Sequence, residues 1–230
     1  MTSFRSNIIS QVEAIPFGKI FTIKDLAFVP SKRANVAVVL SELSKKGIIV
    51  RAEQGAYYKP KKSLLGLKSR VLSYQEKLDF VTTELNGYIT GPYIYNQLRL
   101  TEQVPMTITI ATEKPVRKFE RLNIRFKCVK SYVSNFNSVN LYYLRLLDAI
   151  KSIKSIPGTT PRDVYNRLLC FHFNKFGLEE MKIISNLSLA YPPRVRRILM
   201  DICENFGYNE ESYKLSQTLN SNTSFKSVLN

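Results

Sequence analysis

The chain has 230 residues, of which 44% are hydrophobic, so it is long enough to bury one large core or two smaller ones. Lysine and arginine number 34 against 18 aspartates and glutamates, and the formal net charge of +16 predicts attraction to a polyanion such as nucleic acid. No run of about 18 apolar residues occurs and Met1–Ser10 lacks an apolar signal-peptide region, so we expect a cytoplasmic protein that does not span a membrane.

The positive charge is concentrated near the start of the chain. Residues 1–70 hold 13 Lys or Arg residues against 4 Asp or Glu residues, whereas residues 131–230 hold 12 against 8. Such asymmetry is typical of a basic binding domain followed by a part with another role. The alternative is a protein that is basic only because an AT-rich genome inflates its lysine content.

Two helices are predicted at the start of the chain. Apolar residues at helical spacing predict a helix over residues 4–14. A short strand at Ile20-Phe21 follows. Thr22 with Asp25 then has the pattern of an N-terminal cap for a second helix over residues 23–28.

A third helix and a hairpin come next. We expect a helix over residues 31–46, with Ser31 as its cap and Gly47 as its stop. Gln54-Gly55 lies between two short β-prone runs and predicts a tight hairpin turn. This order of elements predicts a winged helix-turn-helix domain over residues 1–62.

The remainder of the chain is predicted to be a basic linker, residues 63–71, and an α+β and helical module, residues 72–218. Alternating β-branched and apolar residues predict strands over residues 106–112 and 122–130, which we expect in a small antiparallel α/β unit. Segments with helical periodicity follow, and residues 219–230 read as a frayed polar tail. The predicted fold class is α+β.

The helix over residues 31–46 has two different faces. The apolar stripe that we expect in the core consists of Val36, Val39, Leu40 and Leu43. The opposite face carries mostly small side chains, namely Ala34, Ala37, Val38, Ser41 and Lys45. A helix with such a face can enter a major groove closely, and its methyl groups can contact thymine methyls. The alternative is an ordinary core helix with a solvated end.

Arg33 and Asn35 flank the small-residue face, where Arg suits guanine and Asn suits adenine, and Lys32 is assigned to phosphate. The hairpin and linker add further cations. The complete set of predicted DNA contacts is Lys32, Arg33, Asn35, Ser41, Lys45, Arg51, Lys59, Lys61 and Lys62. A possible second basic patch consists of Arg194, Arg196 and Arg197, although pairing along a helix with Asp201 is an equally simple interpretation.

Catalysis has no support in the sequence. His172 is the only histidine, so a site with several histidines is excluded, and we expect it to be packed. The acidic pairs Glu179-Glu180 and Glu210-Glu211 suit positions near helix starts. The three cysteines show no metal-binding or disulfide spacing and are expected to be buried thiols. We therefore predict neither an enzyme nor a bound metal or cofactor.

The stretch FTIKDLA…SKRANVAVVLSELSKKGIIVRAEQGAYYKP resembles the N-terminal winged helix of AbiEi-type antitoxins of type IV toxin–antitoxin systems. The shared pattern is LxxLxxxGxIxRxxxGxYxxP, carried by Leu40, Leu43, Gly47, Ile49, Arg51, Gly55, Tyr57 and Pro60. NGYITGPYIYNQLRLTEQVPMTITIAT and YPPRVRRILMDICENFGY are similar to later segments of the same family.

The resemblance implies a transcriptional repressor that binds operator repeats in double-stranded DNA and regulates its own operon. It also implies antagonism of a nucleotidyltransferase-like toxin, without requiring a stable complex with it. Alternatives are a stand-alone transcriptional regulator, a winged helix that binds protein, and an RNA-binding regulator.

Overall fold

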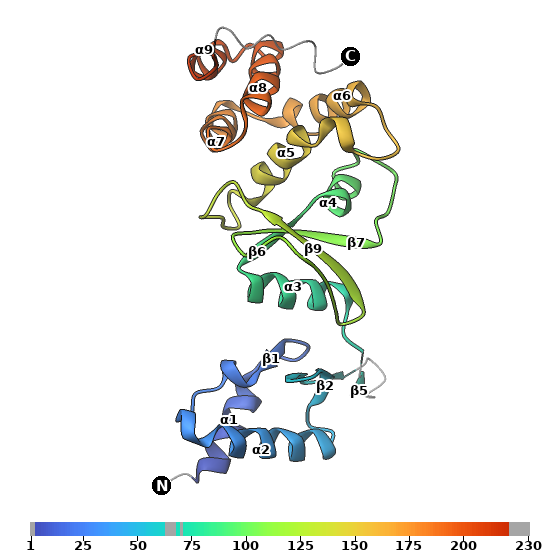
Figure 1. Ribbon diagram of the computed structural model, residues 1–230, viewed down its shortest axis with the longest axis vertical. Helices are drawn as coiled ribbons and strands as arrows, with labels where there is room; N and C mark the ends of the chain where they lie inside the picture. Colours follow the sequence, from blue (N-terminus) through green and yellow to red (C-terminus); the bar gives the residue numbers. More distant parts are fainter. Residues whose placement is uncertain (1–2, 63–67, 70, 221–230) are drawn as a thin grey trace. The chain divides into compact units, whose positions relative to one another are not determined.

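The computed structural model describes residues 3–62, 68–69 and 71–220 (Figure 1). The chain is a mixed α+β protein that divides into two compact units. Unit 1 comprises Met1–Leu85 and Glu120–Asn123, and unit 2 comprises Asn86–Phe119 and Ile124–Asn230. No helix in the described ranges is long and apolar enough to cross a bilayer. Most of the expected linker and most of the expected tail lie outside the described residues.

Unit 1 packs helices against a small antiparallel sheet of strand order β1-β3-β2. Its elements are α1 (Phe4–Ala14), β1 (Ile20–Thr22), the 3₁₀ turns η1 (Ile23–Asp25) and η2 (Pro30–Lys32), α2 (Arg33–Lys45), β2 (Val50–Glu53), β3 (Ala56–Tyr58), β4 (Lys61–Lys62), β5 (Lys68–Ser69) and α3 (Tyr74–Leu85). One apolar core joins α1, α2 and the strands, with Ile8, Phe21, Val36, Leu40 and Ile49 each 1% exposed or less. The 4–14 helix and the Gln54-Gly55 hairpin are confirmed.

The prediction of a second helix over residues 23–28 is wrong, because the structure has only a short 3₁₀ turn there. Thr22 and Asp25 do form a reciprocal capping box, but only a 3₁₀ turn follows it. The backbone of Ala27 is instead held by the Gln11 side chain, which accepts from Ala27 N at 2.7 Å and donates to Ala27 O at 3.0 Å. A tertiary contact therefore replaces the hydrogen bonds that would have continued the helix.

The start of α2 also differs from the prediction. Ser31 does not cap the helix; it lies inside η2, and α2 begins at Arg33 without a side-chain cap. Pro30 begins the 3₁₀ turn, in which Lys32 N donates to Val29 O at 2.8 Å, and this turn runs directly into the α-helix. The expected stop is confirmed, because Gly47 follows the helix with a φ of +68°, a conformation that glycine adopts without strain.

Unit 2 contains a four-stranded sheet of order β6-β7-β9-β8 covered by helices. Its elements are β6 (Gly87–Thr90), α4 (Pro92–Gln97), β7 (Thr107–Thr112), β8 (Lys118–Arg121, whose last two residues are grouped with unit 1), β9 (Ile124–Lys130), α5 (Leu141–Lys151), η3 (Ile153–Ser155), α6 (Pro161–Phe171), η4 (Phe173–Lys175), α7 (Leu178–Ser188), α8 (Pro193–Asn205) and α9 (Asn209–Ser216). Figure 1 shows α4 and α5 next to the sheet and α6 to α9 beyond them.

The expectation of an antiparallel unit is wrong for one strand pair. β6 and β7 are antiparallel, but β7 and β9 are parallel, with Ile108 opposite Phe126 and Ile110 opposite Cys128. The cause lies in the chain path: after β7 the chain forms the edge strand β8, turns at Leu122-Asn123, and then inserts β9 between β7 and β8. Both turn residues have positive φ angles, as a two-residue hairpin requires.

Helix α5 carries a buried carboxylate that is hydrogen-bonded to residues of β6. Asp148 is 7% exposed, and its carboxylate accepts hydrogen bonds from Thr90 Oγ1 at 2.6 Å, Tyr191 OH at 3.0 Å and Tyr88 OH at 3.1 Å. Burial raises the pKa of the Asp148 carboxyl above its ordinary value, although these hydroxyl donors partly offset the effect. The folded state therefore holds the Asp148 proton more tightly than the unfolded chain does.

The variant Asp148→Asn should be increasingly stable relative to the wild type as pH rises. An acid with a raised pKa contributes its full stability below its ordinary pKa of 3.8, and that contribution is lost as pH rises toward the folded-state pKa. Asparagine stays neutral, so urea unfolding from pH 4 to 7 should show the free-energy difference shifting in favour of the variant. Parallel pH profiles of the two proteins would contradict this prediction.

Candidate nucleic-acid interface

Helix α2 has the two faces that its sequence predicts. Val36, Val39, Leu40 and Leu43 are all buried in the core of unit 1. The opposite face is exposed and consists of Ala34, Ala37, Val38, Ser41 and Lys45. Arg5 on α1 pairs with Glu42 at 2.5 Å, which adds a surface link between α1 and α2. The buried stripe therefore fixes α2 on its unit and leaves the small-residue face free to solvent.

Arg33 and Asn35 are exposed at the first turn of α2. Within the described part of the chain, neither side chain has a hydrogen-bond or ion-pair partner. Lys32 is also exposed, and its ammonium lies 4.9 Å from the centre of the Phe4 ring. Two side chains that suit base edges are thus exposed without a polar partner in the described ranges, and they lie beside the Lys32 ammonium at the start of the helix.

The β2–β3 hairpin places Arg51 on an exposed strand position. Its Nε donates to Glu53 O at 3.3 Å, which ties the side chain to its own strand. Gly55 has a φ of +81° in the turn, where its lack of a side chain permits the tight reversal. Tyr58 is buried and Tyr57 is partly buried beside Phe21, so both tyrosines take part in packing.

Lys59 does not belong to the exposed surface, which corrects the prediction. It is 9% exposed, its Nζ donates to Glu13 O at 2.5 Å, and the ammonium lies 4.5 Å from the Phe17 ring centre. Lys61 is exposed but pairs with Glu76 at 2.5 Å, beside Gly18. The side chain of Lys62 lies outside the described residues.

The three predicted arginines of α8 are used in contacts within unit 2. Arg194 Nη2 donates to Lys151 O at 2.5 Å, and Arg196 Nη1 donates to Thr218 O at 3.2 Å. Arg197 pairs with Asp201 at 3.6 Å, as the helical spacing predicts. All three are partly buried. Structural contacts therefore account for these cations better than a second binding patch does.

Other cations of unit 2 are more accessible than these arginines. Lys118, Arg125 and Lys127 are exposed on β8 and β9, on the side of β9 opposite to Ile124 and Phe126. The alternation of residues 122–130 signalled this exposed side, but these residues were not among the predicted contacts. Cys170 is exposed, so the expectation that every thiol is buried is wrong.

His172 is packed in unit 2, as expected, and is 8% exposed. Its Nε2 lies 2.9 Å from Leu98 O, an acceptor only, so Nε2 donates and Nδ1 accepts from Tyr142 OH at 2.8 Å. Burial lowers the pKa of the imidazole. Both ring nitrogens are therefore used in holding α6 against its neighbours. The described residues contain no group of three or more His, Cys, Asp or Glu side chains placed to hold a metal ion.

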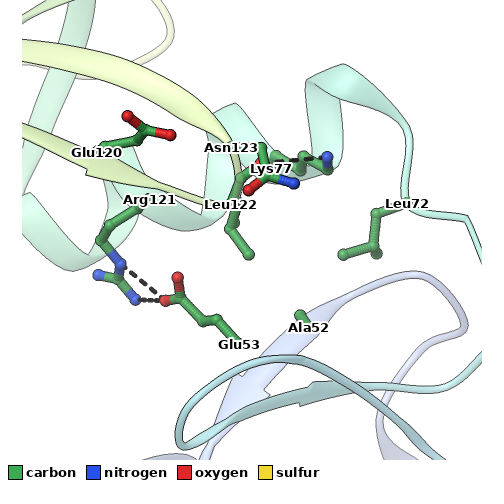
Figure 2. A pocket seen from close by; sticks show the side chains of 8 residues that line it. All are labelled: Ala52, Glu53, Leu72, Lys77, Glu120, Arg121, Leu122 and Asn123. Atoms are coloured by element: carbon green, nitrogen blue, oxygen red, sulfur yellow. Dashed lines mark hydrogen bonds and ion pairs between the residues drawn. The ribbon is translucent and has the colours of Figure 1, made fainter.

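A pocket of about 430 Å³ lies within unit 1 beside the hairpin (Figure 2). Its lining comprises Ala52, Glu53, Leu72, Lys77, Glu120, Arg121, Leu122 and Asn123. Lys77 Nζ donates to Leu122 O at 3.2 Å, and the guanidinium of Arg121 is held by Glu53 and Glu84. Lys77 and Arg121, the two cations of the lining, are thus already bound to acceptors of the same unit.

Residues 7–155 match the model of a family of unknown function, DUF6088, and the chain belongs to that family. No significant match was found among curated proteins. Among solved structures, the chain is similar to the Rv2827c protein from Mycobacterium tuberculosis, with 12% sequence identity and a TM-score of 0.40. That alignment covers 96% of this chain and 83% of the mycobacterial one.

Proposed function

We propose that unit 1 contains a winged helix-turn-helix domain that binds duplex DNA, with α2 in the major groove and the β2–β3 hairpin as the wing. The order α1, β1, η1, α2, β2, β3 and the sheet order β1-β3-β2 support this assignment. The observation that carries it is the exposed small-residue face of α2, flanked by Arg33 and Asn35, whose side chains have no polar partner among the described residues. Such groups at the start of a recognition helix contact base edges.

We further propose that the protein is a transcriptional repressor that acts as a cytoplasmic type IV antitoxin and antagonises a nucleotidyltransferase-like toxin. This part rests on the resemblance to AbiEi-type antitoxins. A reporter driven by the promoter of the chain's own operon should be repressed by the wild type. A neighbouring nucleotidyltransferase-type reading frame should be toxic when expressed alone and tolerated when both are expressed. The absence of such a gene would favour a stand-alone regulator.

DNA binding is tested by the salt dependence of affinity for a random duplex. Each neutralised phosphate contributes a slope of about −0.9 to the plot of log Kobs against log salt concentration. Contacts by Lys32, Lys45 and Arg51 together should therefore give a slope of roughly −3. Fluorescence anisotropy with a labelled 30-base-pair duplex at about 50–300 mM salt measures it. A single-stranded RNA competitor that displaced the duplex would favour RNA binding instead.

A protein-binding winged helix is the second candidate, and one observation favours it. Val38 is 57% exposed in the middle of the small-residue face. An apolar side chain of a partner protein could pack against it there, as a thymine methyl could in DNA. This candidate predicts no measurable affinity for duplex DNA at low salt. Absence of duplex binding at about 50 mM salt would therefore favour protein recognition and contradict the DNA-binding proposal.

A further inference from the structure

We infer that Arg121 is a positioning residue for DNA binding, which fixes the β2–β3 hairpin so that Arg51 is presented to a DNA phosphate. The inference rests on the proposed function of unit 1. Arg121 lies on β8, 68 residues after Glu53, yet it belongs to the same compact unit as the hairpin. It acts through Glu53, and it is not itself assigned to the DNA surface.

The guanidinium of Arg121 binds two carboxylates from different elements. Its Nε donates to Glu53 Oε1 at 2.8 Å, its Nη2 contacts the same oxygen, and its Nη1 donates to Glu84 Oε2 at 2.6 Å. Figure 2 shows the guanidinium of Arg121 directed toward Glu53. The guanidinium carbon Cζ also lies 5.1 Å from the Phe80 ring centre. Strand β2 is thereby linked to α3 through a single rigid, planar cation.

The link is partly shielded from water. The Arg121 side chain is 27% exposed and that of Glu53 is 23% exposed, whereas the cations Arg5 and Lys61 in two other ion pairs of unit 1 are 52% and 58% exposed. Burial alone would lower the pKa of the guanidinium, but Glu53 and Glu84 raise it above its ordinary value. Arg121 therefore stays charged at neutral pH, and salt screens this pair less than an exposed one.

The backbone of β2 connects this link to Arg51. The pairing of β2 with β3 is irregular between Arg51 and Glu53, so Ala52 is an extra residue in β2. Such a bulge changes the direction in which neighbouring side chains point. Glu53 uses its carboxylate to hold Arg121 and its carbonyl oxygen to accept from Arg51 Nε at 3.3 Å. Fixing Glu53 therefore also fixes the strand position and side chain of Arg51.

The test uses Glu53→Gln in the full chain, with Glu13→Gln as the matched control. Glu13 is exposed on α1 of the same unit, and its side chain has no ion-pair partner in the described ranges. Both variants lose one negative charge, so the net charge becomes more positive and charge alone predicts tighter binding to a random duplex for both. A positioning role predicts that Glu53→Gln binds about tenfold more weakly, because the phosphate contact of Arg51 is lost.

A double-mutant cycle identifies the residue through which Arg121 acts. Arg51→Ala should weaken duplex binding about tenfold in the wild type but less than about twofold in the Glu53→Gln background. Arg121→Lys, which keeps the charge but loses the planar fork, should also reduce the cost of Arg51→Ala, and it replaces Glu53→Gln if that variant does not fold.

An equal cost of Arg51→Ala in all three backgrounds would overturn the inference. So would Glu53→Gln binding at least as tightly as Glu13→Gln. These results leave the proposed function intact as long as the wild type binds the duplex. A wild type that fails to bind any duplex contradicts the proposed function itself.

Discussion

Replacing Arg33 or Asn35 by alanine should weaken binding to the preferred duplex by about 1–3 kcal/mol each. Both side chains are exposed at the start of α2, and neither has an internal partner in the described chain. Their removal therefore breaks no hydrogen bond or ion pair among the described residues, so a weaker affinity would report the contacts that we propose with DNA. Arg33 is assigned to guanine and Asn35 to adenine, so discrimination against the corresponding base change should also fall.

Selection from a random duplex library supplies the preferred sequence, and anisotropy titrations at fixed salt then compare the variants. Arg162→Ala is the matched control for Arg33→Ala, because it removes one exposed cation from the first turn of α6 in unit 2. Binding of Arg33→Ala to the selected sequence with wild-type affinity would show that α2 does not enter the groove as proposed.

Replacing Leu40 by alanine should lower the free energy of unfolding by about 2–5 kcal/mol. Leu40 is 1% exposed and packs in the core shared by α1, α2 and the strands of unit 1. Deleting its side chain loses the transfer free energy of the buried atoms and leaves a cavity that close-packed neighbours fill only in part. Urea denaturation followed by circular dichroism measures the change.

Val38→Ala is the control for this prediction, because Val38 lies two residues earlier on the opposite, exposed face of α2. Its replacement should change stability by less than about 0.5 kcal/mol. Equal destabilisation by the two variants would mean that the two faces of the helix are not distinguished by burial. The pair therefore separates the residues that hold α2 in place from those that remain available to a partner.

Local sequence patterns predicted the elements whose hydrogen bonds and packing are local. Helix α1 has the predicted bounds, and the apolar stripe of α2 is buried as its spacing indicated. The turn at Gln54-Gly55 and the stop at Gly47 depend on backbone conformations that few residues adopt easily. The residues that cause each of these features lie within the feature itself or next to it in the sequence, so the sequence alone is enough to predict it.

Features that depend on distant segments were not predictable from the same patterns. Gln11 binds the backbone of Ala27 and ends a predicted helix, and Lys59 is drawn inward by a carbonyl of α1. The parallel pairing of β7 with β9 depends on where β8 is placed. Nothing in the sequence around Glu53 indicates that its partner is Arg121. Exposure of candidate cations is likewise decided by the acceptors that the fold brings near them.

The two units are not consecutive along the chain, because the tip of the β8–β9 hairpin returns to unit 1. Glu120–Asn123 is grouped with unit 1, although the residues on either side of it belong to unit 2. A fragment ending at Leu85 therefore contains every helix and strand of unit 1 except the segment that carries Arg121. Its Glu53 and Glu84 would be two neighbouring carboxylates without their shared cation. A single cut of the chain therefore cannot separate unit 1 intact, whereas residues 86–230 contain all of unit 2.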